Sequence, residues 1–268
     1  MLQRNVCRSY TKRMLARPNI LGLILARGGS KSIPKKSIAL CDGKPLLYYT
    51  IKAAQQSRLL TRIAISTDDE EIAEVARSQG VEVPFMRPKE LAEDEVPDFP
   101  VFQHALTWFR DKESYVPDVV VHLRPTTPFK SPRDIDRGIK LLLDSPDAES
   151  VRSVCTPLHS PFKMYQIKEG EKFLKPLLLG VYPEVFNKDP EAFNLPRQLL
   201  PVVWRHSGYI DVIRASVILE KKSMSGRKIL PLFFDEKRDI DIDTLKELRY
   251  AEEIIRSIRM QEKEVWEE

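Results

Sequence analysis

The 268-residue chain has few cysteines and no long apolar run, and each shortage excludes a class of protein. Its three cysteines, Cys7, Cys41 and Cys155, are an odd number without a CxxC pair, so we expect no disulfide framework and a reducing compartment, the cytoplasm. No apolar stretch approaches the roughly 18 residues of a membrane-spanning helix. We therefore expect no membrane segment.

Histidine and tryptophan are also sparse, and neither forms a functional pattern. The four histidines have no metal-ligand spacing, and the nucleophile elbow of Ser-His-Asp enzymes is missing. The three tryptophans are scattered, which argues against a stacking platform for single-stranded nucleic acid. We expect no nucleic-acid partner.

The net charge of +4 arises almost entirely at the N-terminus. Residues 1–17 contain five basic residues and no acidic one, whereas the remaining chain contains 38 basic and 39 acidic residues. An organellar transit peptide is one interpretation of such a segment, but this one is short and weakly amphipathic. We expect residues 1–18 to be a disordered extension, because termini not tied to a core are usually mobile.

From residue 20 onward, apolar runs alternate with helical patterns. Strands are predicted at 20–25, 62–66, 81–85, 119–123 and 150–156, and again at 203–212 and 229–234. Apolar residues follow helical spacing at 46–54, 72–76 and 101–109, and a final helix is predicted from residue 244. This alternation predicts an α/β fold with a mostly parallel, doubly wound, Rossmann-like sheet. Ligands of such sheets bind beyond the carboxyl ends of the strands.

The first predicted strand leads directly into a cationic, glycine-containing loop, in the sequence ILGLILARGGSKSIPKKS at 20–37. Glycines let a backbone approach phosphate oxygens, and cationic side chains supply a compensating field. Walker A does not fit, because Ser30 stands where that motif needs glycine before Lys31. The dinucleotide fingerprint lacks its third glycine. A polyphosphate loop is favoured, and a solvated basic turn is the alternative.

Several motifs in register give a more specific indication. LARGGSKSIPKKS resembles the first motif of the acylneuraminate cytidylyltransferases, which make CMP-sialic acid and related CMP-nonulosonates, and only Ser37 departs, from asparagine. Further resemblances follow in order as ISTDDEEIA at 65–73, RPKELAED at 87–94, LRPTTP at 123–128, PRQLLP at 196–201 and DIDIDT at 239–244. The resemblance implies one nucleotidyltransferase domain over residues 19–266.

The resemblance also assigns roles in the first motifs. It implies that the nucleotide is bound by the loop residues Arg27, Gly28, Gly29, Ser30, Lys31 and Lys36, with Arg87 at the cytosine. It gives catalytic roles to Arg27, Lys36 and Asp243. Transfer to the α-phosphorus needs charge neutralisation and alignment more than covalent help.

The DIDIDT motif places three carboxylates at alternate positions. In an extended segment Asp239, Asp241 and Asp243 share one side, and the two isoleucines between them share the other. Such a face suits a hard cation such as Mg²⁺, which takes one or two carboxylates plus phosphates and water. A solvated strand edge is the alternative. The resemblance makes Asp241 and Asp243 the metal ligands, with Asp239 at a variable position.

Residues 157–203 interrupt the alternation with seven prolines and no long helical pattern. The resemblance implies that this stretch is an insertion for dimerisation and the sugar site, and hence that the protein is a homodimer. Within or beside it, Lys163, Arg197 and Arg205 are the implied ligands of the sugar carboxylate and the nucleotide phosphates. Arginine suits both groups because its planar fork binds them bidentately.

Arg124 departs from the family, whose matching motif commonly has glutamine facing the sugar. Arginine only donates hydrogen bonds and adds a charge, so the contacts to the sugar must differ. One hypothesis is that Arg124 makes the pocket prefer a sugar acid other than N-acetylneuraminate. The alternative is a structural ion pair with Asp98 or Glu93.

The predicted function is therefore the joining of CTP and a nine-carbon 2-keto sugar acid into a CMP-sugar and pyrophosphate, with Mg²⁺ as cofactor. A related sugar nucleotidyltransferase that uses GTP or UTP is the first alternative. A non-catalytic nucleotide-binding assembly protein is the second, but that interpretation predicts that the loop cations or the acidic ligands are lost, and all are present.

Overall fold

The computed structural model describes residues 17–264, which divide into two compact units. The first contains the described residues up to 153 and from 207 onward, and the second contains residues 154–206. The expected extension at 1–18 lies outside the described residues except for its end, where Arg17 donates a hydrogen bond to the Arg58 carbonyl at 2.7 Å. None of the helices in the described chain is long and apolar enough to cross a membrane.

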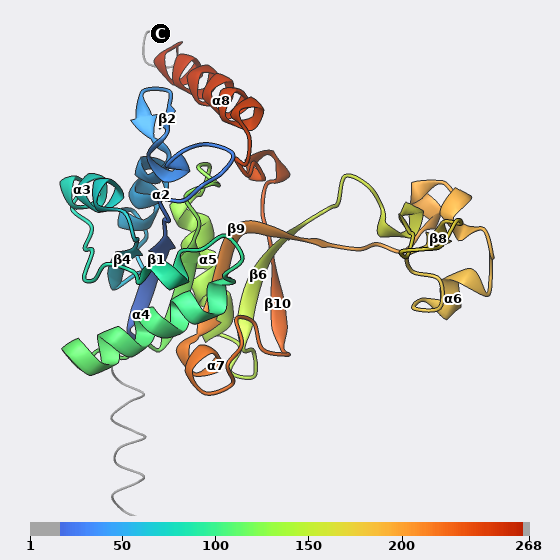
Figure 1. Ribbon diagram of the computed structural model, residues 1–268, viewed down its shortest axis with the longest axis horizontal. Helices are drawn as coiled ribbons and strands as arrows, with labels where there is room; N and C mark the ends of the chain where they lie inside the picture. The colour runs from blue at the N-terminus through green and yellow to red at the C-terminus, as the bar shows by residue number, and fades with distance from the viewer. Residues whose placement is uncertain (1–16, 265–268) are drawn as a thin grey trace, which may run out of the picture. The chain divides into compact units, whose positions relative to one another are not determined.

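The first unit is built on a six-stranded sheet with the strand order β10-β6-β9-β5-β1-β4 (Figure 1). Its strands are β1 (Ile20–Leu25), β4 (Arg62–Ser66), β5 (Val119–Leu123), β6 (Ser150–Cys155), β9 (Arg205–Arg214) and β10 (Ile229–Phe233). Strand β1 pairs in parallel with both β4 and β5, and β5 pairs antiparallel with β9. The predicted mostly parallel α/β sheet is confirmed.

Helices cover both faces of this sheet. They are α2 (Leu46–Gln55), α3 (Glu70–Ser78), α4 (Asp98–Glu113), α5 (Pro132–Leu143) and α7 (Ala215–Leu219). Helix α8 (Leu245–Glu264) packs instead in a separate cluster with Ile33, Cys41 and Leu46. Alternate residues of β1 enter separate cores: Ile20 and Ile24 join apolar residues of α2, α3 and α5, whereas Leu21 and Leu23 join those of α4 and α7. The buried apolar run of β1 is therefore explained by packing on two faces.

Two elements differ from the sequence prediction. The predicted strand at 81–85 forms only isolated bridges, one between Ala64 and Glu82 and one between Thr67 and Met86. Pro84 lies inside this segment and has no N–H to donate to a ladder, which explains why no continuous strand forms. Helix α5 was not predicted, although Ile135, Ile139 and Leu142 repeat at helical spacing and are fully buried.

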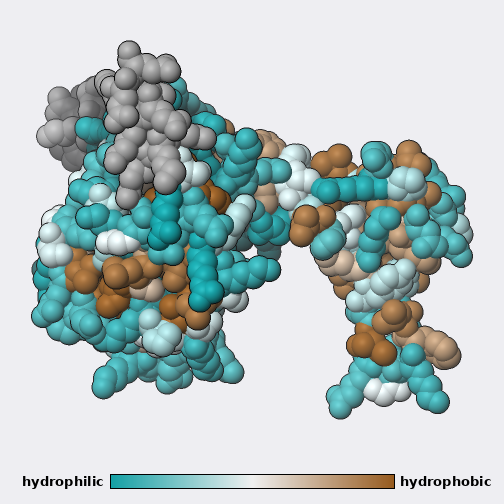
Figure 2. All heavy atoms as spheres, turned by 90° about the horizontal axis from the view of Figure 1, so that it is seen from above, coloured by the Kyte–Doolittle hydropathy of each residue, from teal (hydrophilic) through white to brown (hydrophobic). Residues whose placement is uncertain are grey.

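The second unit, residues 154–206, encloses the predicted insertion at 157–203. Its elements are short: a hairpin of β7 (Tyr165–Gln166) and β8 (Lys175–Pro176), the helix α6 (Pro183–Phe186), and single 3₁₀ turns. A small core contains Phe162, Phe186, Ala192 and Leu200. Many other apolar side chains of this unit are exposed, as the hydrophobic residues on its surface in Figure 2 show.

Candidate active site

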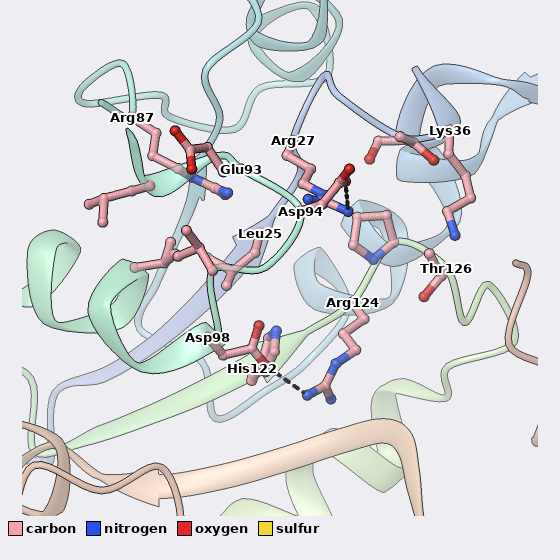
Figure 3. A pocket seen from close by; sticks show the side chains of 16 residues that line it. Leu25, Arg27, Lys36, Arg87, Glu93, Asp94, Asp98, His122, Arg124 and Thr126 are labelled. Atoms are coloured by element: carbon pink, nitrogen blue, oxygen red, sulfur yellow. Dashed lines mark hydrogen bonds and ion pairs between the residues drawn. The ribbon is translucent and has the colours of Figure 1, made fainter. Parts of the chain in front are cut away.

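A pocket of about 310 Å³ opens in the first unit beside the carboxyl ends of β1 and β5. Its lining comes from the loop after β1, the segment 87–98 that leads into α4, and the loop after β5 (Figure 3). It contains Arg27, Ser30, Lys36, Arg87 and Arg124 of the predicted site residues. The structure therefore brings together side chains from three separate motifs.

Gly28 is fixed in the loop after β1 by two carboxylates that follow β4. Its N–H donates to Asp68 Oδ1 at 3.0 Å. A Cβ on Gly28 would lie 2.8 Å from Oδ2 of Asp69 and 2.9 Å from its Cβ, so no larger residue fits without moving Asp69. The same Asp69 side chain caps α3 by accepting from the Ile72 N–H at 3.1 Å. Position 28 therefore requires glycine because the backbone lies so close to Asp69, and not only because glycine lets the backbone approach a phosphate.

The loop cations are paired with carboxylates from distant parts of the chain. Asp94 bonds Arg27 at 2.8 Å and Lys31 at 2.6 Å, and the Lys31 hydrogen bond is the main reason why the pKa of Asp94 is held below its usual range. Lys36 pairs with Asp243 at 2.7 Å. A polyphosphate bound by Arg27 and Lys31 would take the place of the Asp94 carboxylate.

Arg87 is buried, with 5% of its surface exposed, at the side of the pocket. Its Nε donates to Ser66 Oγ at 3.0 Å, and its Nη2 donates to the Ser66 carbonyl at 2.5 Å. Burial lowers the pKa of Arg87 to about 10, so the guanidinium stays charged at neutral pH. Ser66, at the end of β4, therefore holds the charged Arg87 guanidinium in one orientation beside the pocket.

The acidic segment 239–243 confirms the predicted alternation. Ile242 is fully buried and Ile240 partly buried in one cluster, whereas Asp241 and Asp243 are exposed. The Ile242 N–H donates to the carbonyl of Thr126, a pocket residue, at 2.8 Å. Together with the pair between Lys36 and Asp243, this bond holds the acidic segment beside the pocket.

Asp241 and Asp243 have the donor chemistry for a magnesium ion that is shared with a phosphorylated substrate. Among the described residues, no group of three or more His, Cys, Asp or Glu side chains is arranged to hold a metal alone. A pair of carboxylates leaves the other coordination positions to phosphate oxygens and water, as Mg²⁺ prefers. Asp239 has a different partner, because its Oδ1 accepts from Ser207 Oγ at 2.7 Å.

The loop after β5 is anchored through one carbonyl. The Arg124 carbonyl accepts from Thr50 Oγ1 at 3.2 Å, from Thr127 Oγ1 at 3.3 Å and from Lys130 Nζ at 2.5 Å. Lys130 is 6% exposed, and burial places its pKa well below the usual value. Sequence reasoning missed Lys130, since a single lysine in a polar loop has no local pattern that marks it as buried.

The Arg124 side chain lies between two carboxylates. Its Nη2 is 3.1 Å from Asp98 Oδ2, and its Nη1 is 3.1 Å from Asp211 Oδ2 (Figure 3 shows the bond to Asp98). The alternative of an ion pair with Asp98 is confirmed, whereas the one with Glu93 is not formed. Asp211 was not foreseen because it lies on β9, 87 residues further along the chain.

The three remaining predicted residues, Lys163, Arg197 and Arg205, belong to the second unit and are exposed there. Arg197 donates from Nη2 to the Pro157 carbonyl at 2.9 Å, and Arg205 donates from Nη1 to the His206 carbonyl at 3.4 Å. Arg197 also lines a separate pocket of about 270 Å³ within this unit. Their implied role in sugar binding stays a prediction.

Comparison with known proteins assigns the family. The family model described as Cytidylyltransferase matches residues 21–176, more than half of the chain. The chain belongs to the cytidylyltransferase family. The resemblance indicated by the motifs is therefore confirmed, and the protein is a nucleotidyltransferase.

Relatives within this family extend the similarity over most of the chain. A CMP-N,N'-diacetyllegionaminic acid synthase of Legionella pneumophila is 32% identical over 226 residues, 84% of this chain and 91% of that protein. An N-acylneuraminate cytidylyltransferase of Escherichia coli is 30% identical over 235 residues, 88% of this chain and 52% of that protein. A CMP:2-keto-3-deoxy-manno-octonic acid synthetase structure complexed with CTP has a TM-score of 0.64 over 89% of this chain and 99% of that chain at 14% identity, which shows the shared fold.

The two glycines of the first loop provide a matched pair of variants. Gly28→Ala would push a methyl group against Asp69, and we expect the free energy of unfolding to fall by about 1–3 kcal/mol. Gly29→Ala is the control, because a Cβ there meets no atom within 4 Å. Urea unfolding of both variants measures the difference. Equal stability of the two would contradict the proposed contact.

Proposed function

We propose that the protein joins CTP to a nine-carbon 2-keto sugar acid, a nonulosonic acid, and releases a CMP-sugar and pyrophosphate. The observation that carries this proposal is the pocket that gathers Arg27, Lys36 and Arg87 in a chain of the cytidylyltransferase family. The names of the relatives, a CMP-legionaminic acid synthase and an N-acylneuraminate cytidylyltransferase, support the substrate class.

In the proposed reaction, the anomeric hydroxyl of the sugar acid attacks the α-phosphorus of CTP. A new bond forms between that oxygen and phosphorus, the bond from the α-phosphorus to the bridging oxygen breaks, and pyrophosphate departs with the electron pair. The hydroxyl proton passes to water during the attack. Arg27, Lys31 and Lys36 bind the triphosphate and neutralise the charge that grows on the leaving group. Gly28, Gly29 and Ser30 complete this loop.

The burial of the Lys36 side chain, which lines the pocket, supports this role. This side chain is only 14% exposed, and its ammonium group is held 2.7 Å from Asp243. We propose that Asp241 and Asp243 hold Mg²⁺ when the nucleotide binds. A bound ion would supply electrostatic stabilisation of the phosphate charge.

In this proposal, other residues recognise the base and the sugar. Arg87 binds the cytosine, which distinguishes CTP from GTP and UTP. Arg124 contributes to the sugar site, and Lys163, Arg197 and Arg205 bind the sugar carboxylate and the phosphates. All are cationic groups suited to anionic or polar ligands.

We also propose that the second unit mediates a homodimer. Leu158, Phe173 and Val202 are 82%, 79% and 78% exposed, and further apolar side chains of the same unit are exposed beside them in sequence. Exposed apolar surface on this scale is typical of protein interfaces. Sedimentation equilibrium at micromolar concentration should give twice the mass of one chain, and the mass of a single chain would contradict the dimer.

The proposed reaction is tested by pyrophosphate release with each of the four nucleoside triphosphates and with neuraminic, legionaminic and pseudaminic-type acids. We expect release with CTP and at least one of these acids, and catalytic efficiency at least about tenfold lower with GTP or UTP. Turnover with UTP or GTP in preference to CTP would assign the chain to another nucleotide. Release with none of the acids would exclude this substrate class.

The metal assignment is tested by Asp241→Ala and Asp243→Ala. Each removes one carboxylate from the proposed magnesium site, so we expect turnover to fall at least about 100-fold while the far-ultraviolet circular dichroism is unchanged. Asp235→Ala is the control, since Asp235 is an exposed carboxylate close by in sequence. Near wild-type rates of the two variants at saturating Mg²⁺ would refute the assignment.

A further inference from the structure

One corner of the pocket is built from charged groups that hold one another in place. Asp98 begins helix α4, and Arg124 follows β5; both line the pocket, and their side chains lie next to each other (Figure 3). Asp211, on β9, is 2% exposed and binds the other side of the guanidinium at 3.1 Å. Arg124 thus bridges a carboxylate that faces the pocket and one that is buried.

Gly208, on β9, restricts the movement of the Arg124 side chain. Its Nη1 also donates to the Gly208 carbonyl at 3.4 Å, and a Cβ on Gly208 would lie 3.3 Å from Cδ of Arg124. The guanidinium therefore packs over Gly208. His122, whose Nδ1 is 3.7 Å from Asp98 Oδ2, adds no charge, because burial lowers its pKa to about 3.

Two carboxylates around one arginine change what this corner can bind. An unpaired arginine would attract a phosphate or a carboxylate, but here Asp98 and Asp211 balance the charges of Arg124 and of Arg152, whose Nε lies 3.9 Å from Asp211 Oδ1. The anionic groups of the substrates are therefore directed to the end of the pocket with Arg27 and Lys36. The corner at Asp98 is left for an uncharged polar group.

Hydrogen-bonding capacity remains on both pocket-facing partners. Within the described part of the chain, Oδ1 of Asp98 accepts no hydrogen bond, and its side chain is 44% exposed. Arg124 has five N–H donors, and its protein partners account for three hydrogen bonds. A fixed acceptor and a fixed donor thus stand side by side.

We propose that Asp98 and Arg124 form a recognition site for a group that carries a hydrogen-bond donor next to an acceptor, with Asp98 as the residue that determines specificity. Such a group donates its N–H to Asp98 and accepts a hydrogen bond from Arg124. This inference rests on the proposed function, which offers two sources of that chemistry. One is the acylamino group of a sugar acid, and the other is the edge of cytosine, where the amino group adjoins a ring nitrogen.

The experiment measures two preference ratios in the wild type, in Asp98→Ala and in the isosteric Asp98→Asn. The first ratio compares the catalytic efficiencies for a nonulosonic acid that carries an acetamido group and for the same acid with a hydroxyl in its place. The second compares CTP with UTP, in which a carbonyl oxygen replaces the amino group. Asp111→Ala is the control, because Asp111 lies on the same helix and pairs with Arg110.

We expect Asp98→Ala to reduce one of these ratios about tenfold, with a smaller change in the same direction for Asp98→Asn, which keeps an acceptor but loses the charge. A change in the first ratio assigns the site to the sugar acid, and a change in the second assigns it to the base. Both ratios unchanged in both variants would overturn the inference. If the wild type releases pyrophosphate with no sugar acid, the proposed function itself has failed.

Discussion

The parallel pairing of β1 with both β4 and β5 is the constraint on which the site depends. Because these three strands run in the same direction, their carboxyl ends open at one edge of the sheet. The loop with Arg27, the carboxylates Asp68 and Asp69, and the loop with Arg124 therefore meet there, although they are far apart in sequence. Packing against two cores fixes the position of β1, and this in turn fixes where the loop that lines the pocket begins.

Charge pairing is the second organising feature, because most of the predicted substrate-binding cations already have protein partners. Asp94 forms ion pairs with Arg27 and Lys31, and Asp243 forms one with Lys36. Asp98 and Asp211 both pair with Arg124. Such pairs keep long cationic side chains in place before a ligand arrives, which reduces the ordering cost of binding. The partners differ in burial: the buried Asp211 keeps Arg124 in place, whereas Asp94 and Asp243 are exposed, so a phosphate can displace them from their cations.

Local pattern in the sequence was sufficient for the strands and for the alternation of Ile242 between Asp241 and Asp243. Strands β1, β4 and β5 have the predicted bounds, since apolar runs between polar loops specify buried strands. Apart from Asp98 as a partner of Arg124, the charge partners were beyond prediction, because a pair such as Lys36 and Asp243 joins residues 207 positions apart, and only the folded sheet brings them together. Two backbone features were missed although their signals are local: Pro84 interrupts the strand predicted at 81–85, and Ile135, Ile139 and Leu142 repeat at the helical spacing of α5.

The central claim is that the pocket at the carboxyl ends of β1 and β5 binds the nucleotide. A crystal structure of the full chain grown with CTP and Mg²⁺ tests it most directly. The account predicts the triphosphate on the loop of Gly28, within hydrogen-bond distance of Arg27 and Lys36, and Asp94 separated from at least one of its cations. A nucleotide bound elsewhere on the protein, with the pairs of Asp94 intact and the pocket without phosphate, would contradict the account.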